Sequence, residues 1–175
     1  LSLSAELMLQ LVDQVGGQLA AMGVERLVLF NAHGGQIGLL QVAARQLRLR
    51  CPSMGVLPCF IWSGVDCLAS LLPPAELAHG LHAGQAETSL MLHLAPELVG
   101  PSRPVDGAHG PGSPHAPPDG WSLEGAAPCA WLTSDLSQSG VIGDARLASA
   151  ELGLELEQAL ILHWTQRFKS LLSSD

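Results

Sequence analysis

Two short apolar runs, each following a stretch of helical periodicity, constrain the fold of this chain most. The first run covers residues 27–30 (LVLF), and the second covers residues 54–62, where Pro58 bends it. An apolar run without polar alternation is typical of a strand covered on both faces of a parallel sheet. Apolar side chains recur at helical spacing over residues 4–22 and again over residues 37–49. The order helix, strand, helix, strand predicts an α/β fold, with a mostly parallel sheet between layers of helices.

The second half of the chain has weaker patterns. A loop is expected over residues 63–82, followed by a half-buried helix over residues 84–94 that ends before Pro96. We predict a last strand over residues 127–132 and a long helix over residues 145–172, where leucines recur at helical spacing.

A segment rich in proline and glycine lies over residues 100–121. Six prolines and five glycines within this segment leave few apolar side chains for regular structure. We interpret it as an irregular surface loop that acts as a lid or as an oligomer contact. The length of 175 residues predicts that the loop belongs to one domain covering residues 1–175.

The composition excludes several classes of protein. Hydrophobic residues make up 47% of the chain and charged residues 14%, which predicts either a well-buried α/β domain or a subunit with large contact surfaces, and we expect a homo-oligomer. The formal net charge of −8 provides no basic stripe, so nucleic acid is not an expected partner. No apolar stretch approaches the roughly 20 residues of a membrane span, and residues 1–12 lack the basic segment that is typical of a signal peptide. Four cysteines without C-x-x-C spacing indicate free thiols, and we expect a cytoplasmic protein.

The first candidate site follows the first apolar run, in the sequence FNAHGG. His33 stands at the expected carboxyl end of a parallel strand, where ligands bind in α/β folds. Histidine is the commonest metal ligand, and Gly34 and Gly35 permit close approach of the backbone to a ligand. The alternative is that His33 is a polar turn residue, with the side chain of Asn31 making a local turn. No phosphate-loop or dinucleotide motif is present.

The second candidate site lies within residues 79–92. His82 precedes the expected helix, and Glu87 falls in its first turn, so an imidazole and a carboxylate can face one cavity. The alternative is that Glu87 complements the helix dipole while His82 lies in a solvated loop.

Together these motifs resemble the creatininase family, the creatinine amidohydrolases. The resemblance rests on N-A-H-G-G-Q at residues 31–36 and H-A-G-Q-A-E-T-S at residues 82–89, supported by A-P-E-L-V at 95–99 and G-V-I-G-D at 140–144. It implies a three-layer α/β/α fold, usually in an oligomer, with a divalent metal site of zinc or manganese. It also implies hydrolysis of C–N bonds in a small cyclic or linear amide.

The resemblance also implies roles for individual residues. His33 and Glu87 match metal ligands, and His82 matches the histidine that handles protons. A metal-bound water is a nucleophile near neutral pH, and a nearby imidazole can carry its proton to the leaving amine. The residues expected to line the pocket are Asn31, Gly34, Gly35 and Gln85.

The chain departs from the family pattern at several positions. Family members carry an E-x-H segment followed by an aspartate in an N-terminal strand and loop, and the chain is expected to lack this segment before Leu1. Ala32, Gln36 and Gln85 also replace the usual glycine, asparagine and acidic residue. A second hypothesis is therefore a non-catalytic subunit or binding protein that keeps the fold without a complete metal site. Other side chains that can fill gaps in the site or line its pocket are Asp66, His79, Asp119, Trp121 and Asp135.

Overall fold

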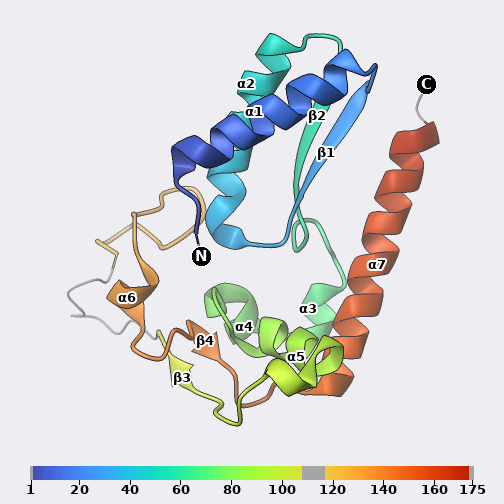
Figure 1. Ribbon diagram of the computed structural model, residues 1–175. Coiled ribbons are helices and arrows are strands. Elements are labelled where there is room, and N and C mark those ends of the chain that lie inside the picture. Colours follow the sequence, from blue (N-terminus) through green and yellow to red (C-terminus); the bar gives the residue numbers. More distant parts are fainter. Residues whose placement is uncertain (1, 108–116, 174–175) are drawn as a thin grey trace. The chain divides into compact units, whose positions relative to one another are not determined.

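The computed structural model describes residues 2–107 and 117–173 (Figure 1). The chain divides into two compact units, Leu1–Gly64 and Val65–Asp175. One domain over residues 1–175 therefore stays a prediction.

The first unit contains a parallel pair of strands joined by a helix. In β1 and β2 the residues pair in parallel register from Arg26 opposite Gly55 to Asn31 opposite Phe60, and α2 connects the two strands. This arrangement confirms the predicted α/β class and the predicted crossover (Figure 1). The elements are α1 (Ala5–Ala21), β1 (Arg26–Asn31), η1 (Gly34–Gln36), α2 (Ile37–Arg50) and β2 (Gly55–Phe60).

Helix α2 forms most of the core of this unit. It buries Leu40, Ala43, Ala44 and Leu47, which lie on one face because their spacing matches the helical repeat. This face packs against α1 and β2. The position of α2 sets the turn after β1, because η1 leads directly from that turn into the helix.

The second unit is mainly helical. Its long helix, α7, contacts α5 and α3, and its two short strands, β3 and β4, pair in antiparallel fashion (Figure 1). The helices predicted near residues 84–94 and 145–172 are confirmed. The elements are α3 (Leu68–Leu71), α4 (Pro74–His79), α5 (Gln85–Leu94), η2 (Pro96–Leu98), β3 (Val105–Asp106), α6 (Thr133–Leu136), β4 (Gly143–Asp144) and α7 (Ala150–Ser173).

Two expectations for this unit are wrong. The segment predicted as a loop over residues 63–82 contains α3 and α4, and α4 begins at Pro74 because proline suits the first position of a helix. The segment predicted as a strand over residues 127–132 contains only an isolated bridge at Pro128, which has no backbone N–H to donate to a sheet. Of the predicted irregular loop, residues 108–116 lie outside the described residues, and Val105–Asp106 forms β3.

Helices α5 and α7 approach so closely that only glycine fits at their contact. A Cβ atom at Gly153 would lie 2.0 Å from the backbone oxygen of Ser89 and 2.7 Å from the Cβ atom of His93. Ser89 is fully buried, so the contact has no room to relax. The two helices form the main contact of the second unit.

Replacing Gly153 with alanine is therefore expected to lower the free energy of unfolding by about 1–3 kcal/mol, the usual cost of overpacking a core. Gly38 of α2 is the matched control, because a Cβ atom there would meet nothing within 4 Å. Gly38→Ala is expected to be neutral or to stabilise by up to about 1 kcal/mol. Urea unfolding of both variants measures the difference. Equal stabilities would contradict the close approach.

Among the described residues, no helix is both long and apolar enough to span a membrane. Cys51, Cys67 and Cys129 carry free thiols, as expected from their spacing.

Candidate active site

Asn31, the last residue of β1, fixes the turn that carries His33. Its side chain is 6% exposed and forms two hydrogen bonds with the backbone of His33. The His33 N–H donates to Asn31 Oδ1 at 3.0 Å, and Asn31 Nδ2 donates to the His33 carbonyl at 2.8 Å. The local turn considered for Asn31 is therefore present, and it holds the backbone on both sides of the imidazole.

The imidazole of His33 is exposed at the carboxyl end of β1 and lies next to Gly35. A Cβ atom at Gly35 would lie 3.0 Å from His33 Nε2, whereas Gly34 faces open space. The glycine thus provides room for the imidazole beside the backbone. Both hydrogen bonds of Asn31 involve only the backbone of His33, so they leave the nitrogens of the imidazole unoccupied.

His82 and Glu87 lie side by side at the start of α5. His82 Nδ1 is 4.0 Å from Glu87 Oε2, and both side chains are about two-fifths exposed, at 44% and 40%. Glu87 Oε2 also accepts the Ala83 N–H at 2.6 Å. The structure therefore brings together the imidazole and the carboxylate predicted from the second motif, and it gives Glu87 a structural role as well.

The motif residues around His82 hold an unusual backbone conformation. Ala83 has φ +49°, and it is the one non-glycine residue with positive φ in the described part of the chain. Glu87 binds its N–H, and Thr88 Oγ1 donates to its carbonyl at 3.0 Å. The backbone of His82 pairs with Ile142 in both directions, with N···O distances of 3.1 and 2.7 Å. These contacts fix the point from which the imidazole projects.

Ser89 anchors the same helix at the next residue of the motif. Its hydroxyl donates to the Gln85 carbonyl at 2.6 Å and accepts the Ser149 N–H at 3.1 Å. Glu87 and Thr88 therefore organise the loop, while Ser89 attaches α5 to the segment before α7.

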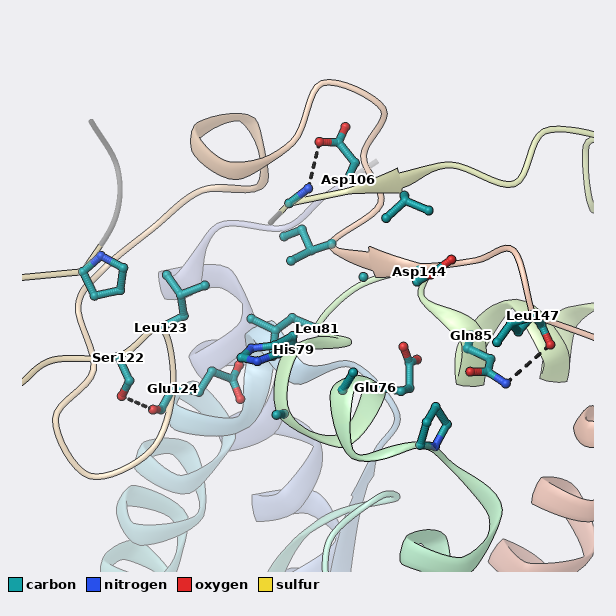
Figure 2. Close-up of a pocket in the computed structure, with 18 residues that line it drawn as sticks. Glu76, His79, Leu81, Gln85, Asp106, Ser122, Leu123, Glu124, Asp144 and Leu147 are labelled. Atoms are coloured by element: carbon teal, nitrogen blue, oxygen red, sulfur yellow. Dashed lines mark hydrogen bonds between the residues drawn. The ribbon is translucent and has the colours of Figure 1, made fainter. Parts of the chain in front are cut away.

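A cavity of about 730 Å³ lies in the second unit, beside the start of α5 (Figure 2). Its walls come from α4, β3, β4, the start of α5 and residues 122–124, and most of its lining is apolar. Gln85, predicted as a pocket residue, lines it, and so does His79. Asn31, Gly34 and Gly35 belong to the turn in the first unit instead. Sequence reasoning did not find Glu76, a buried carboxylate in this cavity.

The two aspartates at the cavity have their charges compensated. Asp144 accepts hydrogen bonds from the guanidinium and backbone of Arg146, which lower the pKa of Asp144 to about 2. The backbone N–H of Ser139, then that of Gly107 and the hydroxyls of Ser139 and Ser137, hold the pKa of Asp106 far below its ordinary value. Asp106 thereby ties β3 to the loop before β4.

Asp106 is expected to make the protein sensitive to acid. Its pKa is lower in the folded state than in the unfolded chain, so its contribution to stability is present above the ordinary value of 3.8. The contribution is lost as the pH falls from there through the depressed pKa. Asp106→Asn is expected to destabilise at pH 7 and to make stability less dependent on pH below 4. Urea unfolding at pH 7 and pH 3 tests this, and an equal loss at both values would contradict it.

The described residues do not by themselves fit a catalytic metal site. No group of three or more His, Cys, Asp or Glu side chains able to hold a metal ion occurs among them. Catalytic zinc generally takes three protein ligands and keeps one open position. His33 in the first unit and Glu87 in the second have the right donor atoms, but two ligands are too few.

The first unit has a parallel strand pair with a histidine turn at its end, and in the second unit the motif H-A-G-x-x-E-T-S spans a loop and the first turn of α5. These two features define the class of this protein. A family model described as "Creatininase: Creatinine amidohydrolase" matches residues 1–168. The chain belongs to the creatininase family, which confirms the resemblance carried by the two motifs.

Two curated relatives that match this sequence are named as peptidases. The chain is 32% identical over 145 residues to a mycofactocin precursor peptide peptidase of Mycobacterium ulcerans (strain Agy99), covering 78% of this chain and 45% of the relative. It is 30% identical over 153 residues to the peptidase of the same name from Mycobacterium tuberculosis (strain ATCC 25618 / H37Rv), covering 83% and 48%. The chain thus spans about half the length of the curated relatives it matches.

Solved structures confirm the fold. A crystal structure of creatinine amidohydrolase matches with a TM-score of 0.71 and 23% identity, covering 100% of this chain and 67% of that chain. A manganese form of creatininase matches with a TM-score of 0.71 and 24% identity, covering 99% and 66%. A variant creatininase of Zn-Zn type also matches, with a TM-score of 0.70, 22% identity and the same coverage. A divalent metal, zinc or manganese, is therefore present in members of this fold.

Proposed function

We propose that this protein is a metal-dependent hydrolase of C–N bonds and that its substrate is a peptide. The observation that carries the proposal is the fixed pair of His82 and Glu87, 4.0 Å apart at the start of α5. The choice of a peptide is supported by the curated relatives at 30–32% identity, which are named as peptidases. A small cyclic or linear amide is the competing substrate class, because the solved neighbours are creatininases.

The imidazole of His82 serves as the acid and base of the reaction. Hydrolysis breaks the C–N bond, adds hydroxide to the carbonyl carbon and adds a proton to the leaving nitrogen. His82 accepts the proton of the attacking water and delivers it to the leaving amine. Nδ1 faces Glu87, and among the described residues Nε2 has no hydrogen-bond partner, so this nitrogen is available for the substrate.

His33 and Glu87 are proposed as ligands of zinc or manganese. Such an ion would activate water and polarise the substrate carbonyl. Under this proposal the described residues contribute two ligands, fewer than the three that a catalytic zinc ion generally takes from a protein. The zinc and manganese forms among the solved neighbours support the choice of metal.

A non-catalytic subunit or binding protein is the second candidate. Glu87 Oε2 already accepts the Ala83 N–H, and no group of three metal ligands occurs in the described residues. Under this hypothesis Glu87 stabilises the loop and the fold persists without hydrolysis. In either case we propose a homo-oligomer, which light scattering on the purified protein measures.

One experiment separates these functions. The purified protein, supplied with zinc or manganese, is incubated with a set of short peptides and with creatinine as a cyclic amide, and the products are identified by mass spectrometry. We expect cleavage of a peptide bond, abolished by a chelator and restored by the metal. Hydrolysis of creatinine alone would overturn the choice of a peptide, and hydrolysis of neither substrate would favour the binding protein.

A further inference from the structure

Glu76 in α4 is the one buried acidic side chain among the described residues. It is 8% exposed, and its carboxylate belongs to the cavity beside the start of α5 (Figure 2). A buried charge is costly unless hydrogen bonds compensate it. Glu76 Oε1 accepts the Ala86 N–H at 2.9 Å, in the first turn of α5. The positive end of the helix dipole favours a carboxylate at this place.

The backbone on both sides of His82 closes around this carboxylate. A Cβ atom at Gly80 would lie 2.5 Å from Glu76 Oε2, and a Cβ atom at Gly84 would lie 2.7 Å from Oε1. A Cβ atom at Gly143, in β4, would lie 3.5 Å from Oε2. The segment 80–84 therefore contacts the carboxylate at both of its ends, and any side chain at either end would displace the carboxylate.

We propose that Glu76 is a positioning residue for the His82–Glu87 pair. Its carboxylate fixes the two ends of the short segment that carries His82, and its hydrogen bond to Ala86 fixes the residue before Glu87. The contacts of Glu87 and Thr88 with Ala83 then determine the conformation between those points. The catalytic consequence rests on the proposed hydrolase function, whereas the fixing of the segment does not.

Two substitutions of Glu76 separate its hydrogen bond from its volume. Glu76→Gln keeps an oxygen that accepts the Ala86 N–H, whereas Glu76→Leu fills a similar space without an acceptor. Gly84→Ala keeps the Glu76 side chain but introduces a methyl group 2.7 Å from Oε1, which is too close, so it displaces the carboxylate by a second route. Leu156→Ala is the control for global stability, because Leu156 is fully buried in α7 of the same unit.

Hydrogen exchange at the amides of Ala83 and Ala86, resolved by mass spectrometry, tests the proposal in the complete protein. Exchange is corrected for the global stability measured by urea unfolding. We expect Glu76→Leu and Gly84→Ala to accelerate exchange at these two amides by about tenfold, the loss of one hydrogen bond. Glu76→Gln and Leu156→Ala are expected to stay within about threefold of the wild type. If Glu76→Leu fails to fold, Gly84→Ala decides the outcome.

Kinetics provide the second readout. For Glu76→Leu, kcat is expected to fall by about tenfold or more with KM nearly unchanged, and Glu76→Gln should recover most of the loss, because the segment orients a group that acts in the transition state. Unchanged exchange at Ala83 and Ala86 in both Glu76→Leu and Gly84→Ala would overturn the proposal. An inactive wild type would refute the hydrolase function, while the exchange data would still decide the role of Glu76.

Discussion

Replacing His82 with alanine is expected to lower kcat for peptide hydrolysis by about 10²–10⁴-fold, the usual contribution of a positioned acid or base. KM is expected to change little, because the imidazole acts in the transition state and not in ground-state binding. The backbone bridge between His82 and Ile142 does not depend on the side chain, so the fold should persist. Steady-state kinetics with the peptide cleaved by the wild type measure the effect.

The matched control for this variant is His163→Ala. His163 lies in α7 of the same unit and contacts Arg167 and Trp164 of its own helix. We expect its kcat to remain within a few-fold of the wild type. A His82→Ala enzyme with nearly full kcat would assign proton transfer to another group, and His79 would be the next residue to test because it lines the neighbouring cavity.

Replacing His33 with alanine is expected to weaken metal binding by more than about 100-fold. Loss of an outer partner of a metal ligand already costs about 10–100-fold, so loss of a ligand itself should cost more. The substitution removes only the imidazole, since both hydrogen bonds from Asn31 involve the backbone of His33. Elemental mass spectrometry of the protein after gel filtration measures the amount of metal bound per chain. Glu25→Gln, at an exposed position of the same unit, is the control.

Glu87→Gln separates the two roles of the Glu87 carboxylate, which accepts the Ala83 N–H and is the proposed metal ligand. The amide oxygen can still accept the Ala83 N–H, so the segment around His82 should keep its conformation. The charge that a zinc or manganese ligand provides is lost, and the metal content should fall. If His33→Ala and Glu87→Gln both retained the metal content of the wild type, neither residue would be a ligand, and His33 would be a turn residue only.

Local patterns in the sequence were sufficient for the main elements. The apolar run before Asn31 and the helical spacing of Leu40, Ala43 and Leu47 predicted a strand and a helix that the structure confirms. The helix prediction succeeds because burial of one face requires a regular spacing of apolar side chains. The apolar run forms the predicted strand, but the expectation that both faces are covered is wrong, because residues 27–29 are only partly buried and Phe30 is exposed. The short helices α3 and α4 have too few turns to show such a spacing, and they were missed.

The candidate site was only partly predictable. The motif at residues 82–89 predicted that His82 and Glu87 face one cavity. The two side chains lie 4.0 Å apart, because both belong to one loop and the first turn of one helix, but neither is among the residues that line the described cavity. The contact of Glu76 with Ala86 joins residues ten positions apart, across a loop whose path depends on Gly80, Gly84 and Gly143. These glycines were visible in the sequence, but nothing in their spacing showed that they surround a carboxylate.

The sequence by itself determined the α/β class, the family and the types of chemical group at the site. These follow from apolar periodicity and from short motifs, which are properties of neighbouring residues. Only the tertiary structure decided that Glu87 and Thr88 hold Ala83 at positive φ and that Glu76 is buried beneath the segment carrying His82. The physical reason is that hydrogen bonding and burial of a charge depend on which backbone groups packing brings within about 3 Å.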